Sequence, residues 1–273
     1  MRTRLTVPLL MCAMLFCASL AGCLGGEETE EKSSVIDLVV YYDTTSGTIE
    51  EVIQNNQQVS ETGVDVTFDF SYTKSSAGQI ETYYFIPGDG SSTLENTADN
   101  GEITYTYLTH GLFDAAIGAI DDQGNENYEN ITIRIDKQIT WTETNTPDPN
   151  TMNIETTPDC DCSAPNQIKI DSTVTNNPNF LGAGGQSVTV TWRLLNSTEV
   201  IAAESPPEQV GDGQDANWLH NQNFIEAGTW KLEVDVSADG NGDEQVNIDH
   251  LVSIVYVEDE STPNPMAAAP PEE

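Results

Sequence analysis

Basic residues are scarce in this chain of 273 residues, which has nine Lys and Arg against 45 Asp and Glu and a formal net charge of −36. Binding to a polyanion needs clustered Lys and Arg, so the composition excludes nucleic acid as a partner. Residues 1–22 hold two arginines and no acid, so the chain from Cys23 onward carries a formal charge of −38. Such a charge destabilises a fold by self-repulsion unless salt screens it, over about 8 Å near 0.15 M. The composition therefore indicates a protein of salty surroundings.

Cysteine is also scarce. Of the five cysteines, three lie within or at the end of the N-terminal leader, and only Cys160 and Cys162 remain. A disulfide framework is therefore absent, and the fold must depend on buried apolar area. Residues two apart in a bent chain can reach the usual Cα separation of about 4.4–6.8 Å, so Cys160 and Cys162 are a candidate disulfide. Free thiols, a soft-metal contact and an intermolecular bridge are the alternatives, and two thiolates alone do not complete a tetrahedral zinc site.

Catalytic patterns are missing as well. The sequence has no Gly-x-Ser-x-Gly elbow, no His-Glu-x-x-His and no Gly-rich phosphate loop. The three histidines, His110, His220 and His250, lie in unrelated contexts. Carboxylate pairs are only as frequent as the acid content dictates, so they give a glycosidase no specific support. We therefore expect that the chain is not an enzyme.

The leader has the three parts of a signal peptide. Arg2 and Arg4 form a positive start, an uncharged and largely apolar stretch runs from Leu5 to Ala21, and small residues precede Cys23. Residues 1–22 are therefore expected to be the signal peptide. An uncleaved anchor and an ordinary secretory signal are the alternatives, since an apolar run of this length could almost span a bilayer.

The end of the leader, Leu20-Ala21-Gly22-Cys23, resembles the lipobox of bacterial and archaeal lipoproteins. With the following Leu24 to Glu27 it is similar to lipoproteins of salt-adapted archaea. The resemblance implies lipidation of Cys23 and a membrane as partner through the lipid anchor. It also implies that the mature chain faces the extracellular side of the cell membrane.

Short apolar runs with a period of two follow the leader, broken by Gly, Asn, Asp and Pro. The clearest run is Val64, Val66, Phe68, Phe70 and Tyr72, with polar residues between. This pattern predicts an all-β chain. No stretch after the leader has the pattern of a long amphipathic helix, although Thr48–Gln54 could form a helical turn.

The length suits two immunoglobulin-like β-sandwiches of about 100 residues each, in tandem after the leader. The first is placed at 35–136, ending after Ile135, and the second at 137–259. Residues 23–34 form an acidic tether after the lipidated cysteine. Residues 260–273, rich in proline and small residues, are expected to be a disordered tail.

The first unit resembles a PKD domain, an immunoglobulin-like sandwich of prokaryotic surface proteins. The resemblance rests on Phe85 before Pro87-Gly88-Asp89-Gly90, on Tyr107 four residues before Gly111, on an alternating strand, and on the turn Asp121 to Gly124. The chain departs from the family in having Ile86-Pro87 for the usual Asp-Phe and Phe85 for the usual Trp. The resemblance implies a spacer or ligand-contact module. From the residues alone, Gly88 and Gly90 are expected to take positive φ, and Asp89 to hydrogen-bond its own turn.

The second unit repeats part of this pattern. Phe224 stands four residues before Gly228, an alternating run begins at Trp230, and a turn follows at Asp239 to Gly242. Phe224 thus occupies the place of Tyr107. Trp192, within another alternating run, is expected to be a core tryptophan.

Calcium is the one candidate cofactor, because it binds hard oxygen ligands. The candidate ligands are in two loops: Asp121, Asp122 and Asn125, next to Glu126, and Asp239, Asn241 and Asp243. The second loop departs from an EF-hand, with Glu244 where Gly is needed and His250 where the bidentate Glu belongs. A solvated hairpin turn is the alternative for both loops. Asn130 and Asn196 are N-glycosylation acceptors in form.

These observations favour a non-enzymatic, lipid-anchored surface protein that acts in adhesion, binding or display. The expected partner is an extracellular protein or a glycan. Solute or polysaccharide capture for a transporter or a partner hydrolase is one alternative, and a purely structural envelope role is another. Exposed clustering of Trp141, Trp218 and Trp230 would favour capture, and their burial would favour the structural role. The loops Pro158–Pro165 and Pro206–Trp218 are the expected place of a site.

Overall fold

The computed structural model describes residues 34–97, 100–178, 185–238 and 244–257. Several predicted features lie outside these residues: the signal peptide, Cys23, the tether up to residue 33, Asp239, Asn241, Asp243 and the C-terminal tail. In the described part of the chain, no helix is both long and apolar enough to cross a bilayer.

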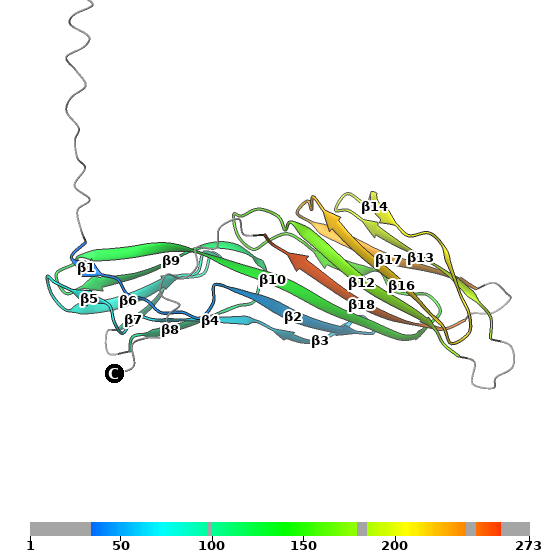
Figure 1. Cartoon of the computed structure of the whole chain (residues 1–273), viewed down its shortest axis with the longest axis horizontal. Coiled ribbons are helices and arrows are strands. Elements are labelled where there is room, and N and C mark those ends of the chain that lie inside the picture. Colours follow the sequence, from blue (N-terminus) through cyan, green and yellow to red (C-terminus); the bar gives the residue numbers. More distant parts are fainter. Residues whose placement is uncertain (1–33, 98–99, 179–184, 239–243, 258–273) are drawn as a thin grey trace, which may run out of the picture. The chain divides into compact units, whose positions relative to one another are not determined.

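Every regular element of the described residues is a β-strand (Figure 1), which confirms the all-β prediction. The strands are β1 (Ile36–Asp37), β2 (Ser46–Gln54), β3 (Gln57–Thr62), β4 (Val64–Asp69), β5 (Lys74–Ser75), β6 (Ile80–Ile86), β7 (Leu94–Thr97), β8 (Glu102–Tyr107), β9 (Gly111–Asp121), β10 (Glu126–Thr146), β11 (Met152–Glu155), β12 (Gln167–Asn176), β13 (Val188–Leu195), β14 (Ile201–Glu204), β15 (Glu208–Val210), β16 (Asp215–Asn223), β17 (Thr229–Ala238) and β18 (Val246–Val255).

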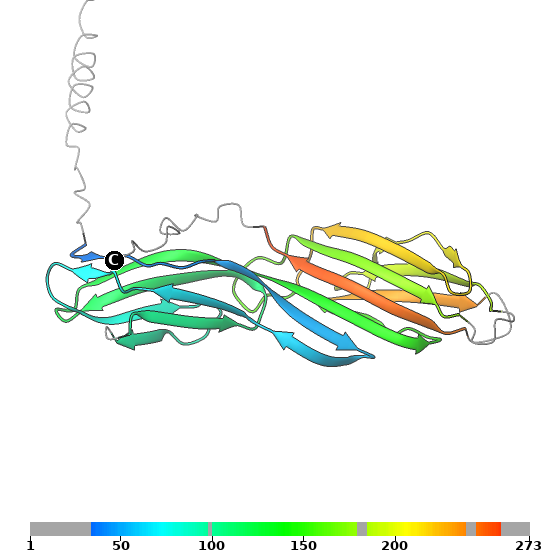
Figure 2. The ribbon, with the colours of Figure 1, turned by 60° about the horizontal axis from the view of Figure 1, so that its bottom comes forward.

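The helical turn expected at Thr48–Gln54 was wrong, because this segment belongs to β2. β2 pairs in parallel with residues 134–142 of β10 and antiparallel with β3. Figure 2 shows this pair of strands beside the second half of β10. The parallel partner is about 90 residues away in the sequence, so local propensity could not reveal the strand.

The strand β10 organises the fold. Its first part, up to Ile135, pairs with β9, and its second part, from Lys137, pairs with β18. Residues 134–135 pair with both β9 and β2, and residues 137–142 pair with both β18 and β2. Because a strand has two edges, β9 and β18 follow one another along one edge and β2 lies on the other. We call the place where β9 gives way to β18 the junction.

Two hydrophobic cores lie on either side of this junction. The first core is packed between the β10-β9-β6-β7 part of the large sheet and strands such as β4 and β8. Its largest fully buried side chains include Phe68, Phe85 and Phe113. The second core is packed between β16-β12-β18-β10 and the sheet β11-β17-β13-β14, around Trp192 and Trp230. Sheets that face one another across an apolar interior are the arrangement of a β-sandwich.

β10 contributes to both cores, with Ile135 in the first and Ile139 in the second. The strand runs unbroken through the predicted boundary at residues 136 and 137. The described residues from Val35 onward belong to one compact unit. The division into two domains therefore stays a prediction, and no linker separates the two cores within β10.

The turn after β6 is as expected. Gly88 and Gly90 have φ of 81° and 82°, which confirms their predicted backbone role. Asp89 Oδ1 accepts a hydrogen bond from Ser91 N at 2.9 Å, so its side chain holds its own turn. The fully buried Tyr107 donates its hydroxyl proton to Pro87 O at 2.7 Å and ties β8 to the same turn.

The expectations for the second unit had mixed outcomes. Trp192 is 1 % exposed, which confirms it as a core residue. Phe224, expected to match Tyr107, is 95 % exposed, so that expectation was wrong. Its φ of 59° places it in a left-handed turn after β16, and the next residue, Ile225, is buried in the second core instead.

Candidate binding cleft at the junction

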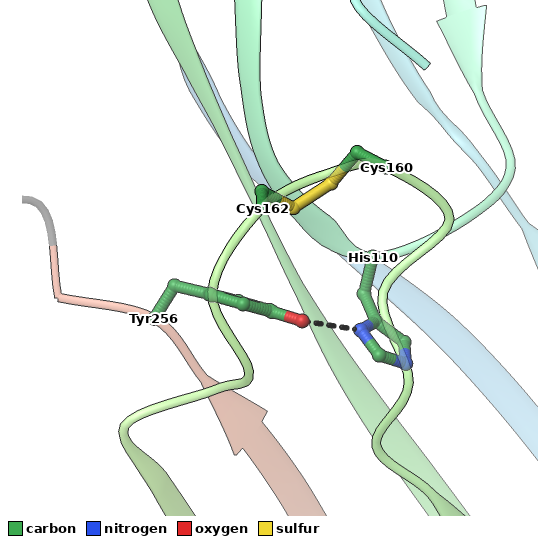
Figure 3. The surroundings of a disulfide bond; sticks show 4 residues. All are labelled: His110, Cys160, Cys162 and Tyr256. Carbon is green, nitrogen blue, oxygen red and sulfur yellow. Dashed lines mark hydrogen bonds between the residues drawn. A yellow bond between two sulfur atoms is a disulfide. The ribbon is translucent and has the colours of Figure 1, made fainter. Parts of the chain in front are cut away.

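At the junction the strand pairing along one edge of β10 is interrupted, and side-chain hydrogen bonds connect the strand ends there. Gly111 is the first residue of β9 paired with β10, and Ile254 pairs with Lys137, so Asp136 has no ladder partner on that edge. Asp136 Oδ1 instead accepts a hydrogen bond from Tyr256 N at 2.8 Å. The Tyr256 hydroxyl lies 2.9 Å from His110 Nδ1. Figure 3 shows this hydrogen bond. Residues next to the ends of β9 and β18 are thereby joined.

The protonation of this pair follows from its surroundings. Burial lowers the pKa of His110 more than the hydrogen bond to the Glu155 carbonyl raises it, so the ring is neutral at pH 7. His110 Nε2 lies 3.1 Å from Glu155 O, which can only accept. We therefore assign the ring proton to Nε2, and Nδ1 accepts from the Tyr256 hydroxyl. Burial, and next the charge of Asp136, raises the pKa of Tyr256, which keeps that donor protonated.

A cleft of about 490 Å³ lies beside this junction. Its walls come from β2, β3, the turn before β9, β10, β11 and the loop after β11. Leu108, Ile53 and Ile139 supply the apolar part of the lining, and His110 lies among them. The charged lining residues are Glu51, Glu61, Lys137, Glu155 and Asp159.

Lys137 is held by two carboxylates across the strands. Its Nζ lies 2.7 Å from Glu51 Oε2 on β2 and 3.2 Å from Glu61 Oε1 on β3. Burial lowers the pKa of Lys137, but the hydrogen bonds and charges of Glu51 and Glu61 raise it above its ordinary value. Lys137 is therefore charged at neutral pH and braces β10 to the pair β2 and β3.

Glu155 on β11 also lines the cleft. Its Oε1 accepts a hydrogen bond from Thr157 N at 3.0 Å and its Oε2 accepts one from Thr229 Oγ1 at 2.8 Å. Burial raises the pKa of Glu155, but these hydrogen bonds lower it by more, so the net pKa is below the ordinary value. The side chain is a carboxylate at neutral pH, and both of its oxygens are bonded to neutral donors.

The loop after β11 carries the two cysteines. Cys160 and Cys162 are joined by a disulfide, with their Cα atoms 5.2 Å apart (Figure 3). Cys160 packs against the first core, and a Cβ at Gly111 would lie 3.0 Å from its Sγ. Among the described residues, 158–165 make no hydrogen bond or ion pair. The disulfide constrains the loop itself, and the packing of Cys160 attaches the loop to the first core beside the cleft.

The predicted calcium loop after β9 is held by hydrogen bonds. Asp121 is fully buried and accepts from Ser75 Oγ at 2.6 Å, from the main-chain NH groups of Gln123 and Asn125, and from Asn125 Nδ2. The hydroxyl of Ser75 is the largest cause of its low pKa, about 2. Asp122 Oδ1 accepts from Gln79 N at 3.1 Å. The described residues contain no group of three His, Cys, Asp or Glu that could hold a metal ion, and calcium here stays a prediction.

The two sequons lie on different elements. Asn130 is exposed on β10. Asn196 is half-buried in the turn between β13 and β14, where its Oδ1 accepts from Thr198 N at 3.1 Å and Val200 N at 2.9 Å. Glycosylation of either stays a prediction.

The remaining histidines do not form a catalytic site. His250 is 1 % exposed, and its Nδ1 lies 2.8 Å from Ser172 Oγ inside the second core. Ser172 is fully buried and also receives Trp192 Nε1–H at 2.6 Å, so no substrate reaches this pair. His220 is half-buried on β16 and stacks on Trp218 with ring centroids 5.0 Å apart.

The tryptophans do not form an exposed platform. Trp141 and Trp230 are 4 % and 2 % exposed, and Trp218 is half-buried. The cleft at the junction has no aromatic ring other than the imidazole of His110 in its lining. The expectation of an aromatic-lined capture face therefore has no support in the described residues.

The expected site loop Pro158–Pro165 supplies one lining residue of the cleft, Asp159, but sequence reasoning missed the strands that form the rest, although β10 carries a signal for it. The odd-numbered residues of β10 from Ile131 to Glu143 are buried apart from Lys137, so Lys137 occupies a core-facing position of an unbroken alternation. A charged residue at such a position marks a place where the strand faces neither core.

Comparison with known proteins gives only remote likenesses to solved structures. No protein family matches the chain, and no curated protein does. A carbohydrate-binding module of the β-sandwich superfamily is 12 % identical, over 81 % of this chain and 92 % of that one, with a TM-score of 0.28. The PKD1 domain of Vibrio anguillarum Epp is 15 % identical, over 37 % and 93 %, with a TM-score of 0.26. Fibronectin(III)-like modules of Clostridium thermocellum CbhA are 13 % identical, over 80 % and 94 %, with a TM-score of 0.24. We draw no functional argument from likeness of this degree.

Proposed function

We propose that the chain is a lipid-anchored, extracellular protein that works by binding or display rather than by catalysis, with a PKD-like first unit. The observation that carries the binding role is the cleft, which is built on strands of both cores and is open to solvent. The lipobox-like Leu20 to Cys23 supports the anchor, and the acid excess with the sequence after Cys23 supports a salt-adapted archaeal source.

The anchor is tested by a single substitution. We expect Cys23→Ala to remove lipid labelling and to release the chain from membranes during cell fractionation. Cys17→Ala is the matched control, because this cysteine lies in the predicted signal peptide and should leave labelling unchanged. A Cys23→Ala chain that remains in the membrane would instead favour an uncleaved anchor.

The binding role is tested by recovery of partners from native membranes at high salt, with the wild-type chain beside the Cys23→Ala chain. A specific extracellular protein or glycan recovered by both would support binding. Recovery only with calcium would support a metal-dependent adhesion, whereas a transporter subunit or hydrolase would favour capture. Recovery of nothing in any state would favour the purely structural envelope role, which the burial of Trp141 and Trp230 also supports.

A further inference from the structure

The charges of the cleft are unevenly balanced. Its lining holds four carboxylates and one ammonium group, so its formal charge is −3 at neutral pH with His110 neutral. The ammonium of Lys137 is engaged by Glu51 and Glu61. The other two carboxylates, Glu155 and Asp159, have no cationic side chain bonded to them in the described part of the chain.

Asp159 is the less engaged of these two carboxylates. It makes no hydrogen bond or ion pair among the described residues, and it is exposed next to the disulfide-bonded Cys160. Among the described residues, the side chain of Glu155 is bonded only to the neutral donors of Thr157 and Thr229. Each oxygen of a carboxylate has two lone pairs, so Glu155 can accept further bonds from a ligand.

An apolar wall accompanies these carboxylates. Ile53 and Ile139 line the cleft, and Leu108 is 63 % exposed at its side. A metal ion would make no use of such a wall and needs several converging ligands, which the described residues do not bring together. An organic cation uses both features, since its charged head pairs with carboxylate and its stem covers apolar surface.

We propose that this cleft binds an alkyl ammonium or guanidinium group. The charged head lies between Glu155 and Asp159, and the methylene stem lies along Ile53, Ile139 and Leu108. The same chemistry is available from a free diamine and from a Lys or Arg side chain of a protein partner. The inference rests on the binding role proposed above and is independent of the anchor.

General acidity is the rival explanation, because a chain with this charge attracts cations everywhere. Two properties separate a site from a diffuse field. Binding at a site depends on particular carboxylates, and it strengthens with stem length because each buried methylene adds affinity. A diffuse field shows neither dependence.

The test is calorimetric titration of the full chain in detergent, at a fixed ionic strength that keeps it folded. The probes are 1,3-diaminopropane, 1,5-diaminopentane and Nα-acetyl-lysine methylamide. We expect Glu155→Gln and Asp159→Asn each to weaken binding about two- to fivefold, the range for exposed charge pairs. Asp171→Asn is the matched control, an exposed carboxylate on β12 outside the cleft, and should leave the affinity unchanged.

The stem is tested separately. Each added methylene should tighten binding about two- to fourfold in the wild-type chain, and Leu108→Ser should reduce this dependence. Since Leu108 is largely exposed, this substitution leaves both cores intact. Binding of acetyl-lysine methylamide as well as the diamines points to a protein side chain as the natural ligand, and binding of the diamines alone points to a free polyamine.

The proposal is overturned if Asp171→Asn weakens binding as much as the cleft variants do, or if no probe binds at millimolar concentration. The Cys23→Ala chain is titrated in parallel, without detergent. If the wild-type chain binds the cations but proves not to be lipidated, the proposed anchor is wrong and the proposed cleft site stands. If the wild-type chain is lipidated but binds no cation, the cleft site is wrong and the anchor stands.

Discussion

The buried imidazole of His250 makes stability depend on pH in a way that can be calculated. Trp192 Nε1–H donates to Ser172 Oγ, so the Ser172 hydroxyl proton is free to point at His250 Nδ1, which then accepts. This arrangement favours a neutral ring. Burial lowers the pKa of His250 from its ordinary 6.5 to about 4.

The direction in which stability changes with pH follows from which state of the chain binds the proton. Between pH 6.5 and about 4 the unfolded chain binds a proton at this residue and the folded chain does not. The free energy of unfolding is therefore at its full value above pH 6.5 and falls as the pH falls through this window. At about 1.4 kcal/mol for each pKa unit, the loss is about 3 kcal/mol when the window has been crossed.

The assay is denaturant unfolding at constant ionic strength, at pH 7 and pH 4.5, of the wild-type chain and His250→Leu. Carboxylates titrate in both chains, so their effect cancels in the difference. Because the variant lacks the titrating ring, its stability deficit should shrink by about 2.5 kcal/mol between the two pH values. An equal loss of stability in the two chains between pH 7 and pH 4.5 would refute the reasoning. An imidazole resonance of His250 that titrates near pH 6.5 in the folded chain would refute it as well.

Three further predictions concern stability. Tyr107→Phe leaves the buried Pro87 carbonyl without its donor and should cost about 1–2 kcal/mol by urea unfolding, with an unchanged slope. Gly111→Ala places a Cβ 2.8 Å from Phe113 Cζ and should cost about 1–3 kcal/mol, read as a lower melting temperature. Lys137→Met leaves its two glutamate partners facing one another and should cost about 1 kcal/mol in moderate salt, less as salt is added; a loss independent of salt would contradict this account.

The all-β class was predictable because its signals are local. Alternation with a period of two places Val66, Phe68 and Phe70 on one face, and all three are buried. The φ values of Gly88 and Gly90 follow from a turn that only glycine enters easily. Predictions that rested only on a residue's place in a repeated sequence pattern were less reliable. Trp192 was placed correctly, but Phe224 was not, because a left-handed turn directs it into solvent and Ile225 takes its place.

The cleft could not be predicted in this way, because its walls come from strands far apart in the sequence that only long-range pairing brings together. The local traces are the loop Pro158–Pro165, which supplies Asp159, and Lys137, which interrupts the buried alternation of β10 without breaking the strand. In the sequence alone, the apolar run of β10 ends at Ile135, and the domain boundary was placed there. In the fold, Lys137 lies between two cores and pairs with β2 and β3 on the outer edge. β10 contributes side chains to both cores, and between them its core-facing position lies in neither core. The charged side chain of Lys137 occupies that position.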